Sequence, residues 1–140
     1  MASKNLIKLM RQGMSVLSNT NRMDRLAKNL EVIKASDTGK CTFQFKVEEE
    51  HLNGLGTLHG GYTAYILDYS TTGALMVMEG NRSGVSVDMS LSYMSAAKVG
   101  DIVTIETECK KKGRNIAFME AEFKKDDKLL VTGKHTKFIG

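Results

Sequence analysis

One helical segment, residues 57–78, carries apolar side chains around much of its circumference. Its apolar positions are Ala64, Ile66, Leu67, Ala74, Leu75, Val77 and Met78. A helix of this kind is usually enclosed by other elements rather than lying on a surface. The chain has 140 residues, of which 41% are hydrophobic, enough for one core. We therefore predict a single domain over residues 1–140, with this helix at its centre.

Apolar and polar residues alternate with period two on both sides of the helix, which indicates half-buried strands. The alternating segments are residues 30–36, 41–47, 85–93, 103–109, 117–123 and 129–138. Turn residues separate them at 37–39, 100–101, 112–113 and 125–127. The pattern predicts an α+β fold, a mainly antiparallel sheet of five to six strands curled around one long helix. The strands after residue 83 are expected to pair locally as a meander.

The N-terminal segment, residues 1–27, is basic and has no acidic residue before Asp24. Leu6, Met10, Met14 and Leu17 follow a spacing near 3.6, which predicts an amphipathic helix. We favour a helix that docks on the domain; mitochondrial targeting is an overlapping role, because a targeting segment is also basic and poor in acids. We expect a cytoplasmic or mitochondrial protein without a membrane span, because no apolar run approaches about 18 residues.

Composition argues against several classes of function. Cys41 and Cys109 are too few for a disulfide framework or a four-ligand zinc site, so we expect reduced thiols in or near the core. The three histidines lack metal-ligand spacing, and no bound metal or cofactor is expected. The net charge of +4 permits an anionic ligand. Aromatic residues, at 6%, are too sparse for a base-stacking surface, so no nucleic-acid partner is expected.

A glycine-rich turn, residues 53–61, leads directly into the apolar helix, which carries a carboxylate at Asp68. Backbone N–H groups at a helix start can receive a developing negative charge. A carboxylate held among apolar side chains can act as a base, because burial raises a carboxyl pKa. The two features together indicate a hydrolytic site.

Each of these residues also has a structural interpretation. Asp68 could be a buried carboxylate satisfied by Tyr69, Ser70 or Thr71. Asn53 precedes a glycine, as turn residues with left-handed backbone often do. His59 either serves as a base or orients the turn by hydrogen bonding, and we favour the second role.

Three segments in order carry a family resemblance: residues 51–61 (HLNGLGTLHGG), 85–95 (VSVDMSLSYMS) and 133–137 (GKHTK). They resemble the animal acyl-CoA thioesterases of the hotdog fold, and the resemblance covers nearly the whole chain. It implies an enzyme that hydrolyses medium- to long-chain acyl-CoA to a fatty acid and free coenzyme A. Two alternatives stay open: a hotdog enoyl-CoA hydratase or dehydratase using His59, and a non-catalytic acyl-CoA binding module.

The resemblance implies roles for individual residues. Asp68 would activate water for attack on the thioester, or attack directly, and we prefer water. Asn53 and the N–H of Gly60 would hold the thioester carbonyl, and Ser86 would position the water. Asn53 and Gly60 of one subunit would face Asp68 and Ser86 of the other in a homodimer, and two dimers would form a homotetramer. On alternation alone, Ser86 would simply lie on the polar face of its strand.

Coenzyme A binding is expected from two further segments and from the strand that carries Ser86. The expected residues are Ser86, Asp88, Tyr93, Met94, Ser95, Ala96, Ala97, Lys98, Lys111, Lys112, Gly113, Arg114, Asn115 and Ile116. The basic turn among them could equally be a solvated hairpin. The chain departs from relatives at Ala96, where they often have proline, and at Phe138, where a close relative has a basic ring. An acyl channel is expected along Leu67, Leu75, Met76 and Met78.

Overall fold

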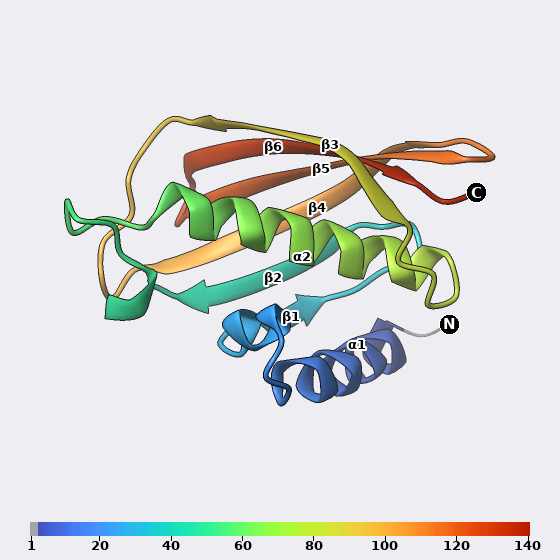
Figure 1. The fold of residues 1–140 in the computed structure, drawn as a ribbon, viewed down its shortest axis with the longest axis horizontal. Coiled ribbons are helices and arrows are strands. Elements are labelled where there is room, and N and C mark those ends of the chain that lie inside the picture. The colour runs from blue at the N-terminus through green and yellow to red at the C-terminus, as the bar shows by residue number, and fades with distance from the viewer. Residues whose placement is uncertain (1–2) are drawn as a thin grey trace.

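A six-stranded antiparallel sheet curls around one long helix in the computed structural model, which describes residues 3–140 (Figure 1). The elements are α1 (Ser3–Ser18), β1 (Glu31–Lys34), β2 (Cys41–Lys46), α2 (Gly60–Met78), β3 (Val85–Tyr93), β4 (Ile102–Lys112), β5 (Ile116–Lys125) and β6 (Lys128–Phe138). Two short 3-10 helices cover Met23–Ala27 and Glu49–His51. This is the hotdog arrangement that the resemblance implies.

The strand order is β1-β2-β4-β5-β6-β3. The predicted meander is confirmed for β4, β5 and β6, which pair in sequence order. It is wrong for β3, which pairs with β6 instead of β4. The link between β3 and β4 is too long for a tight hairpin, and the N–H groups of Met94 and Ser95 both donate to the Leu130 carbonyl. These bonds hold the end of β3 against β6, at the opposite side of the sheet from β1.

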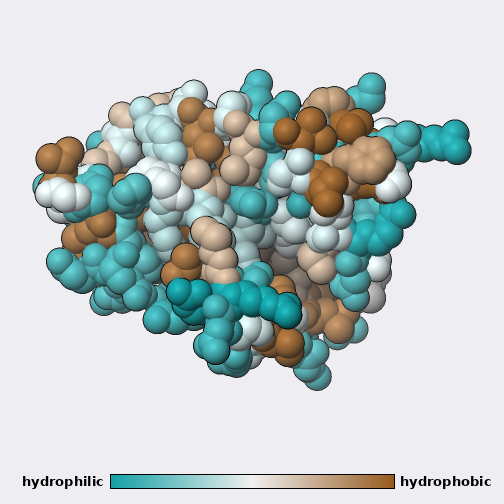
Figure 2. Space-filling model, viewed as in Figure 1, coloured by the Kyte–Doolittle hydropathy of each residue, from teal (hydrophilic) through white to brown (hydrophobic). Residues whose placement is uncertain are grey.

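Strand β3 is an edge strand, and most of its apolar side chains are exposed within residues 3–140. Val85 and Val87 are 63% and 56% exposed, and Tyr93 is 55% exposed. The prediction that residues 85–93 form a half-buried strand is therefore wrong for the single chain. Apolar side chains gather in Figure 2 over the region that β3 crosses in Figure 1. A long edge strand with exposed apolar residues is a template for pairing with another chain.

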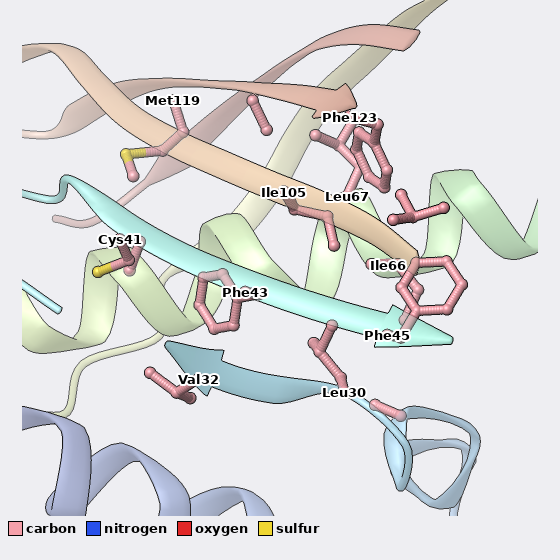
Figure 3. Packing of buried hydrophobic residues seen from close by; sticks show 14 of the residues in the cluster. Leu30, Val32, Cys41, Phe43, Phe45, Ile66, Leu67, Ile105, Met119 and Phe123 are labelled. Carbon is pink, nitrogen blue, oxygen red and sulfur yellow. The ribbon is translucent and has the colours of Figure 1, made fainter. Parts of the chain in front are cut away.

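The core lies between α2 and the sheet (Figure 3). The helix buries one stripe: Thr63, Ile66, Leu67, Ser70, Thr71, Ala74 and Leu75. Phe43, Phe45 and Ile105 come from the strands that the helix crosses. Leu67 and Leu75 are fully buried, so the prediction that they line an acyl channel is wrong. Cys41 is buried and Cys109 half-buried, and both are free thiols, as predicted.

The N-terminal segment docks on the domain, which confirms the first interpretation of residues 1–27 for the part described. Leu6 and Met10 of α1 are buried, and the Arg11 guanidinium donates to the Val32 carbonyl at 2.8 Å. The following 3-10 turn accepts hydrogen bonds from the hydroxyls of Tyr62 and Tyr65. Across residues 3–140, no helix combines the length and hydropathy that a membrane crossing requires.

Candidate active site

The loop before α2 is organised by the side chain of Asn53. Its Oδ1 accepts from the N–H groups of Leu55 at 2.9 Å and Thr57 at 3.1 Å, and its Nδ2 donates to Thr57 Oγ1 at 3.0 Å. The left-handed backbone expected at Asn53 lies instead at Gly56, whose φ is +79°. An amide nitrogen carries two hydrogens, and within residues 3–140 only one is used. The second is available to a ligand.

Helix α2 begins at Gly60 rather than at residue 57, because His59 has extended backbone and caps the helix. The Nδ1 of His59 accepts from the Gly61 N–H at 2.8 Å, as the turn-orienting interpretation predicts. No residue in the described part of the chain accepts a hydrogen bond from the Gly60 N–H. Tyr93 donates to the Gly60 carbonyl at 2.7 Å, and its ring would lie 3.3 Å from a Cβ at this position. Gly60 therefore presents a free donor at a helix N-terminus.

Asp68 lies in the middle of α2 and has a polar environment. Its side chain is 46% exposed, so the prediction of a carboxylate held among apolar residues is wrong. Its hydrogen-bond donor is Thr72, whose Oγ1 lies 3.2 Å from Oδ1, and not Tyr69, Ser70 or Thr71. The hydroxyls of Ser70 and Thr71 donate to carbonyls one turn back in the helix. Within residues 3–140, Asp68 Oδ2 receives no hydrogen bond and can accept one from a ligand or water.

Ser86 faces inward because the β3–β6 ladder is irregular between Ser86 and Asp88. Ser86 is paired with Lys137, and Met89 with His135. Directly paired residues point to the same face of a sheet, so Ser86 and Met89, which lie on either side of the bulge, both point to the helix-facing side. The interpretation of Ser86 as part of a polar outer face is therefore wrong. Its Oγ lies 2.7 Å from the Nε2 of the fully buried His135. That nitrogen also lies 3.9 Å from Asp68 Oδ1, so Asp68 and Ser86 flank one imidazole.

The hydrogen bonds of His135 define which atom carries each proton. Thr71 Oγ1 donates to the Leu67 carbonyl at 2.7 Å, so it accepts from His135 Nδ1, also at 2.7 Å. Burial lowers the pKa of His135, and a neutral imidazole protonated at Nδ1 must accept at Nε2. Ser86 consequently donates its hydrogen to Nε2. The Ser86 oxygen is left as an acceptor toward solvent.

Lys137 is the second buried polar residue at this site, and it is 3% exposed. Its Nζ donates to Thr72 Oγ1 at 2.6 Å. Burial lowers the pKa of Lys137, and the nearby Asp68 opposes that effect. Sequence reasoning assigned no role to His135 or Lys137. The available signal was their spacing in the last strand, since both lie an even number of residues from the apolar Val131 and Ile139.

Apart from Ser86 and Asp88 of β3, the residues expected to bind coenzyme A fall into two groups. Residues 93–98 lie beside the loop that precedes α2, where the Ala97 carbonyl accepts from the Leu58 N–H. Residues 111–116 form the predicted hairpin turn between β4 and β5, closed by a 2.7 Å bond from the Gly113 N–H to the Ile116 carbonyl. Lys112 is already paired with Glu79. Lys111, Arg114 and Lys98 are exposed, without an ion pair in the described chain.

One chain does not bring all these groups together. Gly60 and Asp68 are eight residues apart on α2, a separation of about 12 Å along the helix axis. The loop holding Asn53 lies at the left of Figure 1, whereas the β4–β5 hairpin lies at the right, near the start of β3. Asp68, Ser86 and His135 therefore form one half of the predicted site, and Asn53 and Gly60 form the other. Residues 3–140 contain no group of three His, Cys, Asp or Glu side chains that could hold a metal ion.

Comparison with known proteins places this geometry in a family. The model of the thioesterase superfamily matches residues 55–132. Acyl-coenzyme A thioesterase 13 of Mus musculus is 40% identical over 133 residues, covering 94% of each chain. The crystal structure of zebra fish thioesterase superfamily member 2 has 38% identity and a TM-score of 0.92, covering 96% of this chain and 98% of the other. A hypothetical thioesterase from Streptococcus pneumoniae, solved with coenzyme A, has 27% identity and a TM-score of 0.75, covering 81% and 87% of the two chains.

Proposed function

The chain belongs to the thioesterase superfamily, and we propose that it hydrolyses medium- to long-chain acyl-CoA to a fatty acid and free coenzyme A. The observation that carries this proposal is that Asp68 and Ser86 meet at one atom, the Nε2 nitrogen of the buried His135, which lies 3.9 Å from Asp68 Oδ1 and 2.7 Å from Ser86 Oγ. The names of the relatives support the substrate class, since one is an acyl-coenzyme A thioesterase and another was solved with coenzyme A.

The free acceptor oxygens of these two residues, Asp68 Oδ2 and Ser86 Oγ, suit the activation of one water molecule. One hydrogen of the water goes to Asp68 Oδ2 and the other to Ser86 Oγ, which leaves an oxygen lone pair for the thioester carbon. Asp68 takes the first proton as the carbon–oxygen bond forms. The tetrahedral intermediate then collapses, the carbon–sulfur bond breaks, and the coenzyme A thiolate receives that proton. The Ser86 hydrogen remains on the imidazole side, because His135 accepts it.

The developing oxyanion needs donors, and Gly60 and Asn53 supply them. The Gly60 N–H is unpaired within the described chain and lies at the positive end of α2. The second hydrogen of Asn53 Nδ2 is also free. Each well-placed donor contributes roughly 3 kcal/mol to lowering the barrier. Because Gly60 lies about 12 Å from Asp68 along the same helix, and Asn53 lies in the loop before that helix, we propose that both donors act on the active site of a second subunit.

Pairing of two β3 strands provides that assembly. An antiparallel pair around a two-fold axis near Met89 puts Tyr93 of one protomer beside Val85 of the partner subunit. Tyr93 is bonded to Gly60, so the Gly60 N–H of one protomer approaches Ser86 of the partner subunit. The same contact covers the apolar side chains that β3 exposes. We propose this homodimer as the active unit, with two dimers forming a tetramer.

The dimer also gathers the positive charges for the phosphates of coenzyme A. Lys111 and Arg114 lie at the hairpin near the Ser86 end of β3, and Lys98 lies near the Tyr93 end. Pairing of two β3 strands brings those ends together across the interface. We assign the phosphate contacts to these three exposed cations, since Lys112 is held by Glu79.

Thiol release from acyl-CoA tests the proposal. Purified protein is incubated with acyl-CoAs of increasing chain length, with Asp68→Asn beside the wild type and Asp127→Asn, in an exposed turn, as the charge-matched control. The expected result is thiol release by the wild type and the control, and a loss of at least about 100-fold in Asp68→Asn. Binding without thiol release, or hydration of an enoyl-CoA in place of hydrolysis, would contradict the proposal.

A further inference from the structure

We propose that Lys137 is a positioning residue for the hydrolysis: its ammonium orients the Thr72 hydroxyl, which fixes Asp68 Oδ1 and turns Oδ2 toward the attacking water. The inference rests on the proposed function and adds a residue to the same site. Lys137 lies on β6, opposite Ser86 in the sheet ladder, and reaches α2 through Thr72.

The direction of this hydrogen-bond chain follows from the chemistry of its members. An ammonium has three donors and no acceptor, so at the 2.6 Å contact Lys137 donates and the Thr72 oxygen accepts. The single Thr72 hydrogen is then free for Asp68 Oδ1, which lies 3.2 Å away. A carboxylate accepts and does not donate, so the chain runs one way, from Lys137 to Thr72 to Asp68. It ties one oxygen of the carboxylate and leaves the other free.

Burial makes this arrangement demanding for the protein. Lys137 is 3% exposed, and enclosing an ammonium costs free energy unless partners compensate. The charged and titratable groups that interact with it are Asp68 on α2 and His135 on its own strand. A methionine would fill similar space without that cost, so packing alone does not require the charge. A role for the ammonium next to Asp68 explains why a charged residue is present at this buried position.

The ammonium also lies within about 6 Å of the Asp68 carboxylate, since one hydroxyl separates them. Loss of Lys137 should therefore lower kcat with little change in KM, whereas a purely structural role would lower stability without that split between kcat and KM.

Paired variants test the chain at each link. Thr72→Val removes the hydroxyl and keeps the side-chain shape, whereas the control Thr72→Ser keeps the hydroxyl. Lys137→Met removes the buried ammonium, and the control Lys134→Met removes an ammonium at an exposed position of β6. We expect kcat to fall about 10-fold in Thr72→Val and in Lys137→Met, with KM within about 2-fold, because only the nucleophile is affected. Thr72→Ser and Lys134→Met should behave as wild type.

The double variant Thr72→Val, Lys137→Met decides whether the two residues act as one unit. In a single chain of hydrogen bonds, the second change costs little once the first has broken the link, so the double variant should match the singles within about 2-fold. Multiplied losses in the double variant, an unchanged kcat in Lys137→Met, or a Thr72→Ser as slow as Thr72→Val would each overturn the inference. A wild type without thiol release would instead refute the proposed function.

Discussion

Gly133 in β6 allows α2 to approach the sheet at the point where Asp68 meets His135. A Cβ at this position would lie 2.6 Å from Leu67 Cδ2 and 2.9 Å from Cδ1, whereas carbon atoms in contact are about 3.5–4.0 Å apart. Leu67 is fully buried and must shift by about 1 Å, since no free space surrounds it. Overpacking of this size costs about 2 kcal/mol, and the expected loss of stability in Gly133→Ala is of that order.

The same shift reaches the active site. Asp68 follows Leu67 on the helix, and His135 lies two residues beyond Gly133, so the 3.9 Å separation of Asp68 and His135 should widen. A displacement near 1 Å at a reacting group can lower the rate by about 100-fold, and we expect kcat in Gly133→Ala to fall by at least about 10-fold.

Urea unfolding and steady-state kinetics measure both effects, at one protein concentration because subunit association adds to stability. Leu67→Ala alone should cost about 2–5 kcal/mol, and the double variant should cost about 1–2 kcal/mol less than the two single variants together. Gly13→Ala is the control, since a Cβ there meets nothing within 4 Å in α1, and it should stabilise by about 0.5–1 kcal/mol. A Gly133→Ala within about 0.5 kcal/mol of wild type, with additive losses in the double variant, would refute the reasoning.

Three further predictions concern the histidines and α1. His135→Leu should lower kcat about as much as Ser86→Ala, on the order of 10-fold. The double variant should lose no more than about 2-fold beyond either single variant, because the two residues share one hydrogen bond. Losses that multiply in the double variant would contradict this coupling. Burial lowers the pKa of His51 and of His135 in the folded protein below the value in the unfolded chain. The free energy of unfolding should therefore be highest above the unfolded pKa, about 6.5, and should fall as the pH drops below it. The expected slope is up to about 1.4 kcal/mol per pH unit for each histidine. Urea unfolding across this pH range should show the slope. The variant His51→Asn keeps an acceptor for the Glu48 N–H and should reduce the slope. A free energy of unfolding in the wild type that does not change with pH would contradict the lowered histidine pKa values. Leu6→Ala in α1 should destabilise by about 2 kcal/mol or more, whereas the exposed Leu9→Ala should stay within about 0.5 kcal/mol, and equal thermal unfolding of the two would contradict the docked helix.

The elements of the fold were predictable because their patterns are local. The apolar character of α2 and the alternation in β2, β4 and β5 depend on neighbours in sequence, and those elements appear where expected. The pairing of β3 with β6 was not predictable in this way, since it joins residues 38 to 53 positions apart and depends on the path of the intervening chain. The alternation in β3 was detected correctly, but it described a face that this chain does not bury.

The candidate site shows the same division. Asn53, Gly60 and His59 lie in one turn, so their local roles could be considered from sequence. The environment of Asp68 depends on His135 and Lys137, which arrive from β6 at the opposite end of the chain. Polar residues in a strand are expected to face solvent, and only the packed sheet shows that these two face the helix.

The inward turn of Ser86 likewise depends on a bulge. The irregularity lies between Ser86 and Asp88 in the ladder with β6, and alternation along β3 alone placed Ser86 on the polar face. The ion pair between Lys112 and Glu79 was also not predictable from the sequence, in which the cations of the basic turn could not be told apart.

Subunit complementation tests most directly the claim that the active site is shared between two protomers. Asn53→Ala and Asp68→Ala are each expected to be nearly inactive alone. After the two are unfolded together and refolded as an equal mixture, half of the dimers are mixed, and each mixed dimer contains one intact site, so about one quarter of wild-type thiol release should return. Recovery near that level is the predicted result. No recovery in a mixture shown to contain mixed dimers would contradict the shared site.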